Sequence, residues 1–472
     1  MTHPTLPSDA TVVLRRQVYG LLLTLAVALV VGRVLSVGGM ISWNDISRWA
    51  TIRALVENGT FAIGEREELA DGTYRDYGLV FDHGKTWETG DKVLNPEPVV
   101  ENLEARGRDM RAVKQFFSSK PPLMPTVMAG GYWVLHHGLG WSFDTDLTVI
   151  VRTMLLILNV VPFAIYLALM ASIIERCGTT DWGRIVTFAA CCFATFLLPF
   201  QITLNNHTIA ACFLVFGVYP LLRRSEGEPF TASSLLWAGW WLGWMVCNEL
   251  PSLAFAGLVG FFVWYRQPTK AMLTFVPGML LPVASLVYTN YLAIGQWQPA
   301  YAQFGTVWYN YPGSPWLNPT GIDGGEKTIG LYLLHQLIGH HGIFSLTPLF
   351  LLSLVGFVWA WPKGQLEPAS LRLVTRGTFV VFVVVFCFYL TKTESYNYGG
   401  WTSGLRWFFW LIPLFVLALL PVVDRLGRGR WGRFLVLLLL VPSVISISYP
   451  LANPWRHPWL YVWMESMGWI AY

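Results

Sequence analysis

The sequence contains few charged residues. Only 13% of its 472 residues are Asp, Glu, Lys or Arg, whereas about 25% is usual in soluble proteins. Hydrophobic residues make up 54% of the chain and include 24 Trp and 29 Phe. So few charges cannot cover so much apolar surface in water. The composition therefore excludes a soluble domain, a disordered chain and a collagen-like repeat, and it predicts a polytopic membrane protein.

Cysteine is scarce too, and the two signs of charge nearly cancel. Five of the six cysteines lie in apolar runs, so we interpret them as small core residues rather than a disulfide framework or a metal site. The formal net charge of +4 gives no indication of a nucleic-acid partner. The first apolar run is followed by a poor signal-peptidase site, so we expect it to remain as a helix.

Long apolar runs are what the sequence has in abundance. Spanning a bilayer takes roughly 17–25 residues, and eleven runs are close to that length. We therefore expect an all-α polytopic membrane protein with about eleven transmembrane helices. The predicted spans are residues 17–39, 147–174, 183–201, 206–222, 232–249, 251–265, 270–292, 342–361, 374–391, 405–423 and 434–449.

The basic residues decide how these spans are threaded. Lys and Arg gather in alternate loops, which the positive-inside rule assigns to the cytoplasm. The same rule assigns the apolar segment 122–137 to the membrane interface, because counting it as a span would invert every later loop. The expected parts are a cytoplasmic N-terminus with the first helix (1–39), an extracytoplasmic loop with juxtamembrane helices (40–146), a helix bundle (147–449) with an extracytoplasmic loop at 293–341, and an extracytoplasmic tail (450–472).

The first loop begins with a predicted amphipathic helix. Apolar residues recur at positions 46, 49, 52, 55 and 56, and Asn58 and Gly59 end the pattern, so we expect this helix to lie along the membrane surface. Asp45 stands at its start. This carboxylate is interpreted either as a helix cap or as a general base at the bilayer rim.

The same loop returns to the membrane at Lys120, Pro121 and Pro122. A residue before proline avoids helical angles, and the prolines then begin a helix whose free amides favour an anion. Lys120 is therefore predicted either to bind a lipid phosphate or to extend its ammonium group to the interface.

Other polar residues of the predicted outer face extend this candidate site. Arg406 begins a span and either contacts a second phosphate oxygen or anchors the interface. His207 either hydrogen-bonds a sugar or headgroup or caps a helix. Glu249, between two apolar runs, has either a structural partner or a catalytic role. His340 and His341 have no third ligand at metal spacing, which argues against a metal ion at these two histidines.

Two segments in this order resemble the GT-C superfamily of integral-membrane glycosyltransferases. The similar branch contains protein O-mannosyltransferases and the lipid A aminoarabinose transferase. The stretches that carry the resemblance are Asp45-Ile46-Ser47-Arg48-Trp49-Ala50 and Lys120-Pro121-Pro122-Leu123 with Tyr132-Trp133. A third stretch, Tyr398-Gly399-Gly400-Trp401-Thr402-Ser403-Gly404-Leu405-Arg406, resembles a Gly-Gly-Trp-x-x-Gly-Pro-Arg motif of glycosyltransferase-like bacterial membrane proteins.

The resemblance implies a bacterial inner-membrane enzyme whose donor is a polyprenyl-phosphate-linked sugar. Asp45 matches the family's base, which accepts the proton of an acceptor hydroxyl, and Lys120 matches its phosphate-contacting lysine. Trp401 joins the expected substrate-binding residues through its motif. Three positions depart from the family: Ile46 replaces a second acid, Ser119 replaces a glutamate associated with a metal, and Leu405 replaces a proline.

The function expected from these residues is sugar transfer from the lipid-linked donor to a glycan, lipid or protein acceptor at the extracytoplasmic face, with inversion at the sugar carbon. Two alternatives stay open. One is a transporter or lipid flippase, which ordinarily shows repeats or paired broken helices. The other is an inactive relative that binds lipid-linked sugars, which the missing second acid favours.

Overall fold

A computed structural model describes residues 9–101, 111–224, 227–362, 366–393 and 397–472. The fold is mostly helical, and six helices within those ranges are long and apolar enough to cross a membrane. This agrees with the prediction of a multi-pass helical membrane protein. The six are Ala10–Ser36, Phe143–Cys177, Pro268–Ile294, Ala369–Leu390, Arg406–Leu426 and Arg430–Ser448.

Each of the eleven predicted apolar segments overlaps helical structure. Several long helices are composites in which a π-helical or 3-10 turn continues an α-helix, as at Leu156–Val160, Ala271–Phe275 and Arg406–Leu411. The α-helical parts of the bundle are α1 (Asp9–Ser36), α5 (Phe143–Leu155), α6 (Val161–Cys177), α7 (Asp181–Phe193), α8 (Asn206–Leu222), α9 (Ala232–Asn248), α10 (Leu253–Arg266), α11 (Pro268–Lys270), α12 (Val276–Ile294), α15 (Leu351–Trp359), α16 (Ala369–Leu390), α17 (Ile412–Leu426) and α18 (Arg430–Ser448).

The centre of the bundle is the segment that ends in α17. Within Arg406–Leu426, 89% of the most apolar stretch is buried inside the protein, compared with 22% in α1 and in α18. This helix packs against α7, α15, α16 and α18. Helices from several parts of the chain therefore pack around a core helix that comes late in the sequence.

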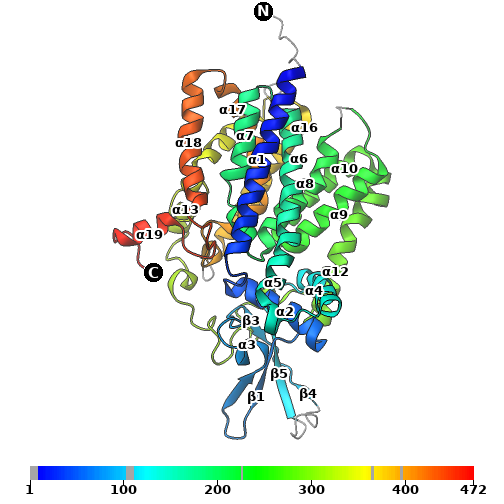
Figure 1. Ribbon diagram of the computed structural model, residues 1–472, viewed down its shortest axis with the longest axis vertical. Helices are drawn as coiled ribbons and strands as arrows, with labels where there is room; N and C mark the ends of the chain where they lie inside the picture. Colours follow the sequence, from blue (N-terminus) through cyan, green and yellow to red (C-terminus); the bar gives the residue numbers. More distant parts are fainter. Residues whose placement is uncertain (1–8, 102–110, 225–226, 363–365, 394–396) are drawn as a thin grey trace, which may run out of the picture.

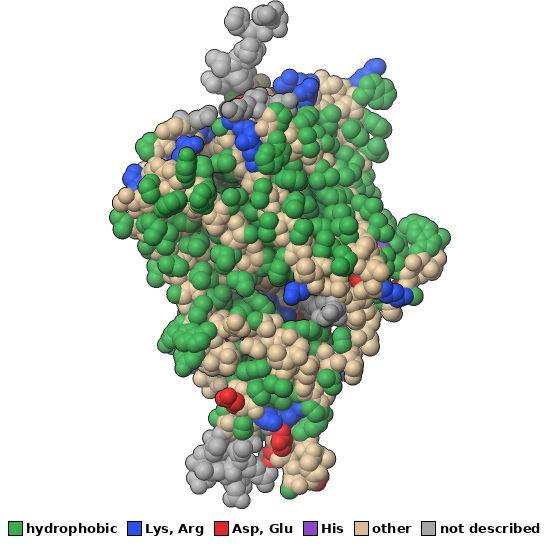
Figure 2. Space-filling view, turned by 180° about the vertical axis from the view of Figure 1, so that it is seen from behind, with side chains coloured by type: hydrophobic (Ala, Val, Ile, Leu, Met, Phe, Trp, Pro, Cys, Tyr) green, Lys and Arg blue, Asp and Glu red, His purple; other side chains and the backbone are tan. Residues whose placement is uncertain are grey.

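The two ends of the bundle differ in structure and in charge. Figure 1 shows the helices running vertically, with the N-terminus at one end and a small sheet projecting from the other. In Figure 2, hydrophobic side chains cover the middle of the visible face, and Lys and Arg side chains gather at the end near the N-terminus.

A five-stranded antiparallel sheet in the first loop departs from the expected all-α fold. The strand order is β2–β1–β5–β3, and β4 also pairs with β5. The strands give little sequence signal, because β1 reads Gly-Glu-Arg-Glu-Glu and shows no alternation of apolar and polar residues. The strands are β1 (Gly64–Glu68), β2 (Tyr74–Tyr77), β3 (Lys92–Leu94), β4 (Val99–Glu101) and β5 (Arg111–Ser118).

The sheet and three helices of the loop cover the end of the bundle. The predicted surface helix is present as α2 (Trp43–Arg53), continued by a π-helical turn to Asn58 and ended by Gly59 at φ 67°. Both of its faces are covered, because every residue from Asn44 to Arg53 is buried. Segment 122–137 forms α4 (Leu123–Leu139), which packs beside α2, and a short α3 (Leu79–Asp82) precedes β3.

Short elements complete the same end of the molecule. They connect α12 to α15 and follow α18, near the sheet (Figure 1). They include α13 (Ile329–Leu337), α14 (Ile343–Leu346), α19 (Trp459–Ser466) and 3-10 turns at Ala300–Gln303 and Gly321–Gly324. A further 3-10 turn, Pro199–Ile202, lies between α7 and α8.

Candidate functional site

Asp45 is fully buried and accepts four hydrogen bonds. The backbone amides of Ile41 and Ser42 donate to it at 3.2 and 2.8 Å, the Ser42 hydroxyl at 3.1 Å, and the Thr203 hydroxyl at 2.7 Å. The helix cap itself is Ser42, and Asp45 completes a capping box from the third helical position. Burial raises the pKa of Asp45, and the hydrogen bonds from Thr203, Ser42 and Ile41 oppose that rise.

Thr203 connects Asp45 to the centre of the bundle. Its hydroxyl accepts a hydrogen bond from Trp455 Nε1 at 2.9 Å, and its backbone carbonyl accepts one from the buried Asn159 side chain at 2.9 Å. The Trp455 ring in turn lies under the guanidinium of Arg406, 4.9 Å from its carbon. Asp45 and Arg406, which are 361 residues apart in the sequence, are therefore joined through two intervening side chains.

Arg48 is a buried site residue that the sequence analysis did not single out. It lies one turn after Asn44 on α2, and its Nη1 donates to the Asn44 carbonyl at 2.7 Å. Its Nη2 donates to the Asn206 side chain at 2.6 Å. The Asn206 amide then donates to Glu249 Oε1 at 2.7 Å. The spacing of Asn44 and Arg48 was visible in the sequence, but the distant partner that brings Arg48 into the site was not.

His207 and Glu249 form a contact pair in the interior. His207 Nδ1 lies against Glu249 Oε1, and both side chains are buried. The helix cap expected of His207 is instead supplied by Asn205, whose side chain accepts from the Thr208 amide at 3.0 Å. Arg406, Arg48 and Lys120 all lie within electrostatic range of the His207 ring. The structure therefore brings four of the six predicted site residues, and Arg48, into one region.

Lys120 is held at the end of β5. Its amide donates to the Ser118 hydroxyl at 3.2 Å, and that hydroxyl donates to Ser47 Oγ on α2 at 3.1 Å. Lys120 Nζ forms an ion pair with the buried Asp91 at 3.0 Å. Three residues later α4 begins at Leu123, so the lysine stands beside a helix start, as the Lys-Pro-Pro sequence predicted.

The glycines before Arg406 explain how that side chain is accommodated. Gly399 has φ 92°, and a Cβ atom at this position would lie 2.7 Å from Arg406 Nε and 2.8 Å from its Cγ. Gly404 is also tightly packed, because its Cβ would approach the Phe196 ring to 3.1 Å. The Gly-Gly-Trp-x-x-Gly-x-Arg pattern thus has a physical basis: it makes room for a buried arginine.

Asp323 is a second carboxylate that the sequence analysis missed. It lies in the Gly321–Gly324 turn, and its buried Oδ1 has no hydrogen-bond partner among the described residues. Burial raises the pKa of Asp323 to about 6, against the opposing influence of Arg406 and with a further increase from Asp91. The loop composition around Asp323 gave no sign of this proximity.

A small cleft opens beside Lys120. Its volume is about 10 Å³, and Ser118, Thr51 and Asn290 contribute polar side chains to its lining. Asn290, on α12, is 1% exposed, and neither atom of its amide group has a hydrogen-bond partner in the described part of the chain. A buried amide in this state is costly, so Asn290 is a further candidate for contact with a polar ligand.

Trp401 does not join this region. It is 62% exposed, and its ring packs against His457 at 4.6 Å between centroids. The nearby His340 and His341 lie in a cluster of histidine and tyrosine rings, where His340 stacks on His335 at 3.9 Å. Within the described ranges, no three His, Cys, Asp or Glu side chains form a group suited to a metal ion.

We define the polar cluster as Arg48, Asp91, Lys120, His207, Glu249, Asp323 and Arg406. It combines three cations with three acids, and these residues come from well-separated parts of the chain. Such a group can bind a phosphate through the cations and exchange a proton through a carboxylate. Neither a protein-family model nor a curated protein sequence matches the chain, so the functional argument depends on this chemistry and on the sequence motifs.

Proposed function

We propose that the protein is a GT-C-like membrane glycosyltransferase that moves a sugar from a polyprenyl-phosphate donor to an acceptor hydroxyl. The supporting observation is the convergence of Arg48, Lys120 and Arg406 beside buried carboxylates at one end of a helical membrane bundle. Departure of a lipid phosphate needs positive charge at the leaving oxygen, and attack by a hydroxyl needs a base. The polar cluster and Asp45 offer both.

The proposed reaction has one displacement step. The acceptor oxygen forms a bond to the sugar's anomeric carbon while the bond from that carbon to the phosphate oxygen breaks, and its electron pair leaves with the lipid phosphate. The hydroxyl proton passes to a carboxylate. Attack opposite the leaving group inverts the anomeric carbon. In this proposal Lys120 and Arg406 contact the phosphate, and His207 with Glu249 contacts the sugar.

Two carboxylates are candidates for the base. The family resemblance assigns the role to Asp45, whereas Asp323 has an unpartnered buried oxygen within the described residues and a pKa of about 6. A base whose pKa lies near the working pH is the more effective one. We propose Asp45 as the base because of the family resemblance, and Asp323 as the alternative base because of its unpartnered oxygen and its pKa.

The proposed topology places the cluster on the extracytoplasmic side. Basic side chains near the N-terminal end of the bundle support a cytoplasmic N-terminus under the positive-inside rule. Eleven spans, with the sheet and the polar cluster outside a bacterial inner membrane, complete this arrangement.

A second candidate function is a binding subunit for lipid-linked sugars that has no transferase activity. It is favoured by the state of Asp45, which is fully buried and already accepts four hydrogen bonds. A carboxylate in this state acts well as a structural cap. The same cations would then hold the donor without transfer.

One set of variants tests both functions. Asp45→Asn, Asp323→Asn and Lys120→Ala are assayed in membrane vesicles for sugar transfer from a radiolabelled polyprenyl-phosphate sugar. Lys85→Ala, at an exposed lysine of the first loop, is the control for Lys120. We expect transfer by the wild type and the control, and its loss in Lys120→Ala and in one of the two Asp variants.

The outcomes separate the candidates. Donor binding by the wild type without transfer supports the binding subunit and overturns the enzyme. Wild-type transfer in both Asp variants excludes these carboxylates as the base. Equal activity of Lys120→Ala and Lys85→Ala contradicts the phosphate-binding role of Lys120.

A further inference from the structure

A large cavity lies far from the polar cluster. Its volume is about 870 Å³, within the range of roughly 300–1,000 Å³ typical of small-molecule sites. The helix α8 begins beside the cluster at Asn206 and ends at the cavity with Leu222. At 1.5 Å per residue, its 17 residues separate the two places by roughly 25 Å. The cavity is thus at the end of the bundle away from the sheet.

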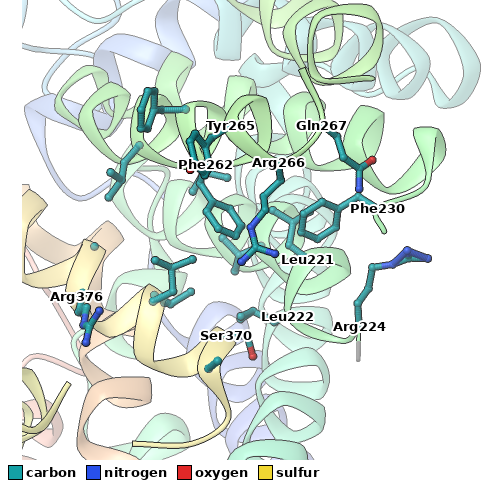
Figure 3. Close-up of a pocket in the computed structure, with 18 of the residues that line it drawn as sticks. Leu221, Leu222, Arg224, Phe230, Phe262, Tyr265, Arg266, Gln267, Ser370 and Arg376 are labelled. Atoms are coloured by element: carbon teal, nitrogen blue, oxygen red, sulfur yellow. The ribbon is translucent and has the colours of Figure 1, made fainter. Parts of the chain in front are cut away.

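The cavity has an apolar interior. Its walls come from α8, α10 and α16 and from the segment that joins α8 to α9. Figure 3 shows aromatic and aliphatic side chains facing one another across it, among them Phe230, Phe262, Leu221 and Leu222. An interior of this kind suits a hydrocarbon chain, because burying it there removes apolar surface from water.

The rim of the cavity is basic. Five of its lining residues are cationic, and Glu228 is the one acid among its lining residues in the described chain; it pairs with Arg224 at 3.2 Å. Several of the remaining cations donate to neutral carbonyl groups, such as Lys270 to Phe230 at 3.1 Å. A carbonyl partner leaves the positive charge uncompensated. The five cations are Arg176, Arg224, Arg266, Lys270 and Arg376.

Arg266 is the cation best placed to meet an anion. It ends α10, and its guanidinium lies over the Phe262 ring, 5.3 Å from the centroid. Within the described residues it has no hydrogen bond or ion pair. Figure 3 shows the guanidinium between Phe262 and Leu221, directed toward Leu222 and Ser370. Five donors in a fixed fork therefore stand at the mouth of an apolar cavity.

We propose that this cavity binds one anionic phospholipid from the surrounding leaflet, with an acyl chain in the apolar interior and the phosphate on Arg266. Charge complementarity identifies the occupant, because a basic pocket between membrane helices attracts an anionic headgroup. An acyl chain accounts for the apolar walls, which a free phosphate does not. The site is independent of the proposed transfer reaction, whose lipid phosphate belongs at the polar cluster.

Native mass spectrometry of the full-length protein in detergent tests the proposal. The delipidated protein is titrated with dioleoyl phosphatidylglycerol and, separately, with dioleoyl phosphatidylcholine. We expect one tightly bound phosphatidylglycerol and much weaker binding of phosphatidylcholine. Arg266→Gln should weaken the phosphatidylglycerol complex by about tenfold or more, as expected for the loss of hydrogen bonds to a charged group.

Two further variants control for charge and for shape. Arg430→Gln removes an exposed arginine that also stacks on an aromatic ring, Trp431, at 5.5 Å but does not line the cavity; we expect wild-type binding. Ser370→Trp keeps all five cations and fills the cavity near its mouth, so it should also lose the bound lipid. Thermal unfolding without lipid verifies that each variant is folded.

Several results overturn the proposal. Equal affinity for the two lipids excludes selection by the charge of the headgroup. Indistinguishable binding by Arg266→Gln and Arg430→Gln removes the role of Arg266. Wild-type binding by a folded Ser370→Trp variant shows that the lipid does not bind in the cavity. Binding of glycerol phosphate as tightly as phosphatidylglycerol identifies a headgroup site with no acyl-chain contribution.

Discussion

Replacing Gly399 by alanine tests whether the glycine pair positions Arg406. The new methyl group would lie 2.7 Å from Arg406 Nε and 2.8 Å from Cγ, the latter close to the base of the side chain. Rotating the outer part of the arginine alone cannot relieve the second contact. The whole side chain must therefore move away from the position where it lies over Trp455 and near Asp323.

Two energies set the expected effects of Gly399→Ala, the first on stability and the second on the transfer rate. A left-handed conformation costs a residue with a side chain about 1–2 kcal/mol, and Gly399 has φ 92°. If the displaced Arg406 loses one hydrogen bond to the donor phosphate, about 1.5–3 kcal/mol of transition-state stabilisation is lost. At about 1.4 kcal/mol per factor of ten, that corresponds to a roughly 10- to 150-fold lower rate at subsaturating donor.

The assay measures transfer from the labelled lipid-linked sugar per folded protein, together with the melting temperature. Gly140→Ala is the matched control, since Gly140 has φ 72° but no atom within 4 Å of the added Cβ. Both variants should melt at a lower temperature, and only Gly399→Ala should lose transfer. Equal transfer rates in the two variants, or an unchanged rate in Arg406→Ala, would refute the reasoning.

Three other predictions concern the surroundings of the site. If Asp323 is the base, the rate in the wild type should rise with pH through about 6 as the carboxylate loses its proton, and Asp323→Asn should abolish that limb of the pH–rate profile. Thr203→Val removes the 2.7 Å hydrogen bond to Asp45 and should lower stability by about 1–3 kcal/mol, measured by thermal unfolding; a change under 0.5 kcal/mol contradicts it. Tyr132→Phe removes the 2.6 Å hydrogen bond to Glu57 and should cost about 1 kcal/mol while leaving transfer unchanged.

The helices were the part of the fold that the sequence predicted best. Apolar runs such as 206–222 have bounds that coincide with those of α8, because a run of that length has few other ways to satisfy its backbone in lipid. The sheet was not predicted, since β1 lacks alternation. The packing partners of α2 were not predictable either. The loop and the bundle bury this helix on both faces, so it has no face free to lie on the membrane surface.

For the candidate site, sequence reasoning succeeded where a residue carries its own local signal. Lys120 precedes two prolines and Arg406 follows a glycine pair, and both lie in the polar cluster. Arg48 and Asp323 carry no such signal. They become site residues only through Asn206 and Arg406, which are distant in the sequence. Trp401 belongs to a sequence motif but does not lie in the polar cluster, because its side chain is exposed at the surface.

The burial of α17 has a consequence for how the protein is made. Chains are synthesised from the N-terminus, so α7, α15 and α16 leave the ribosome before the central helix against which they pack. The position between these three helices is therefore filled only after they have been made, by the segment that starts at Arg406. Because Arg406 opens this segment and belongs to the polar cluster, a nascent chain that ends before residue 406 contains neither the central helix nor the complete cluster.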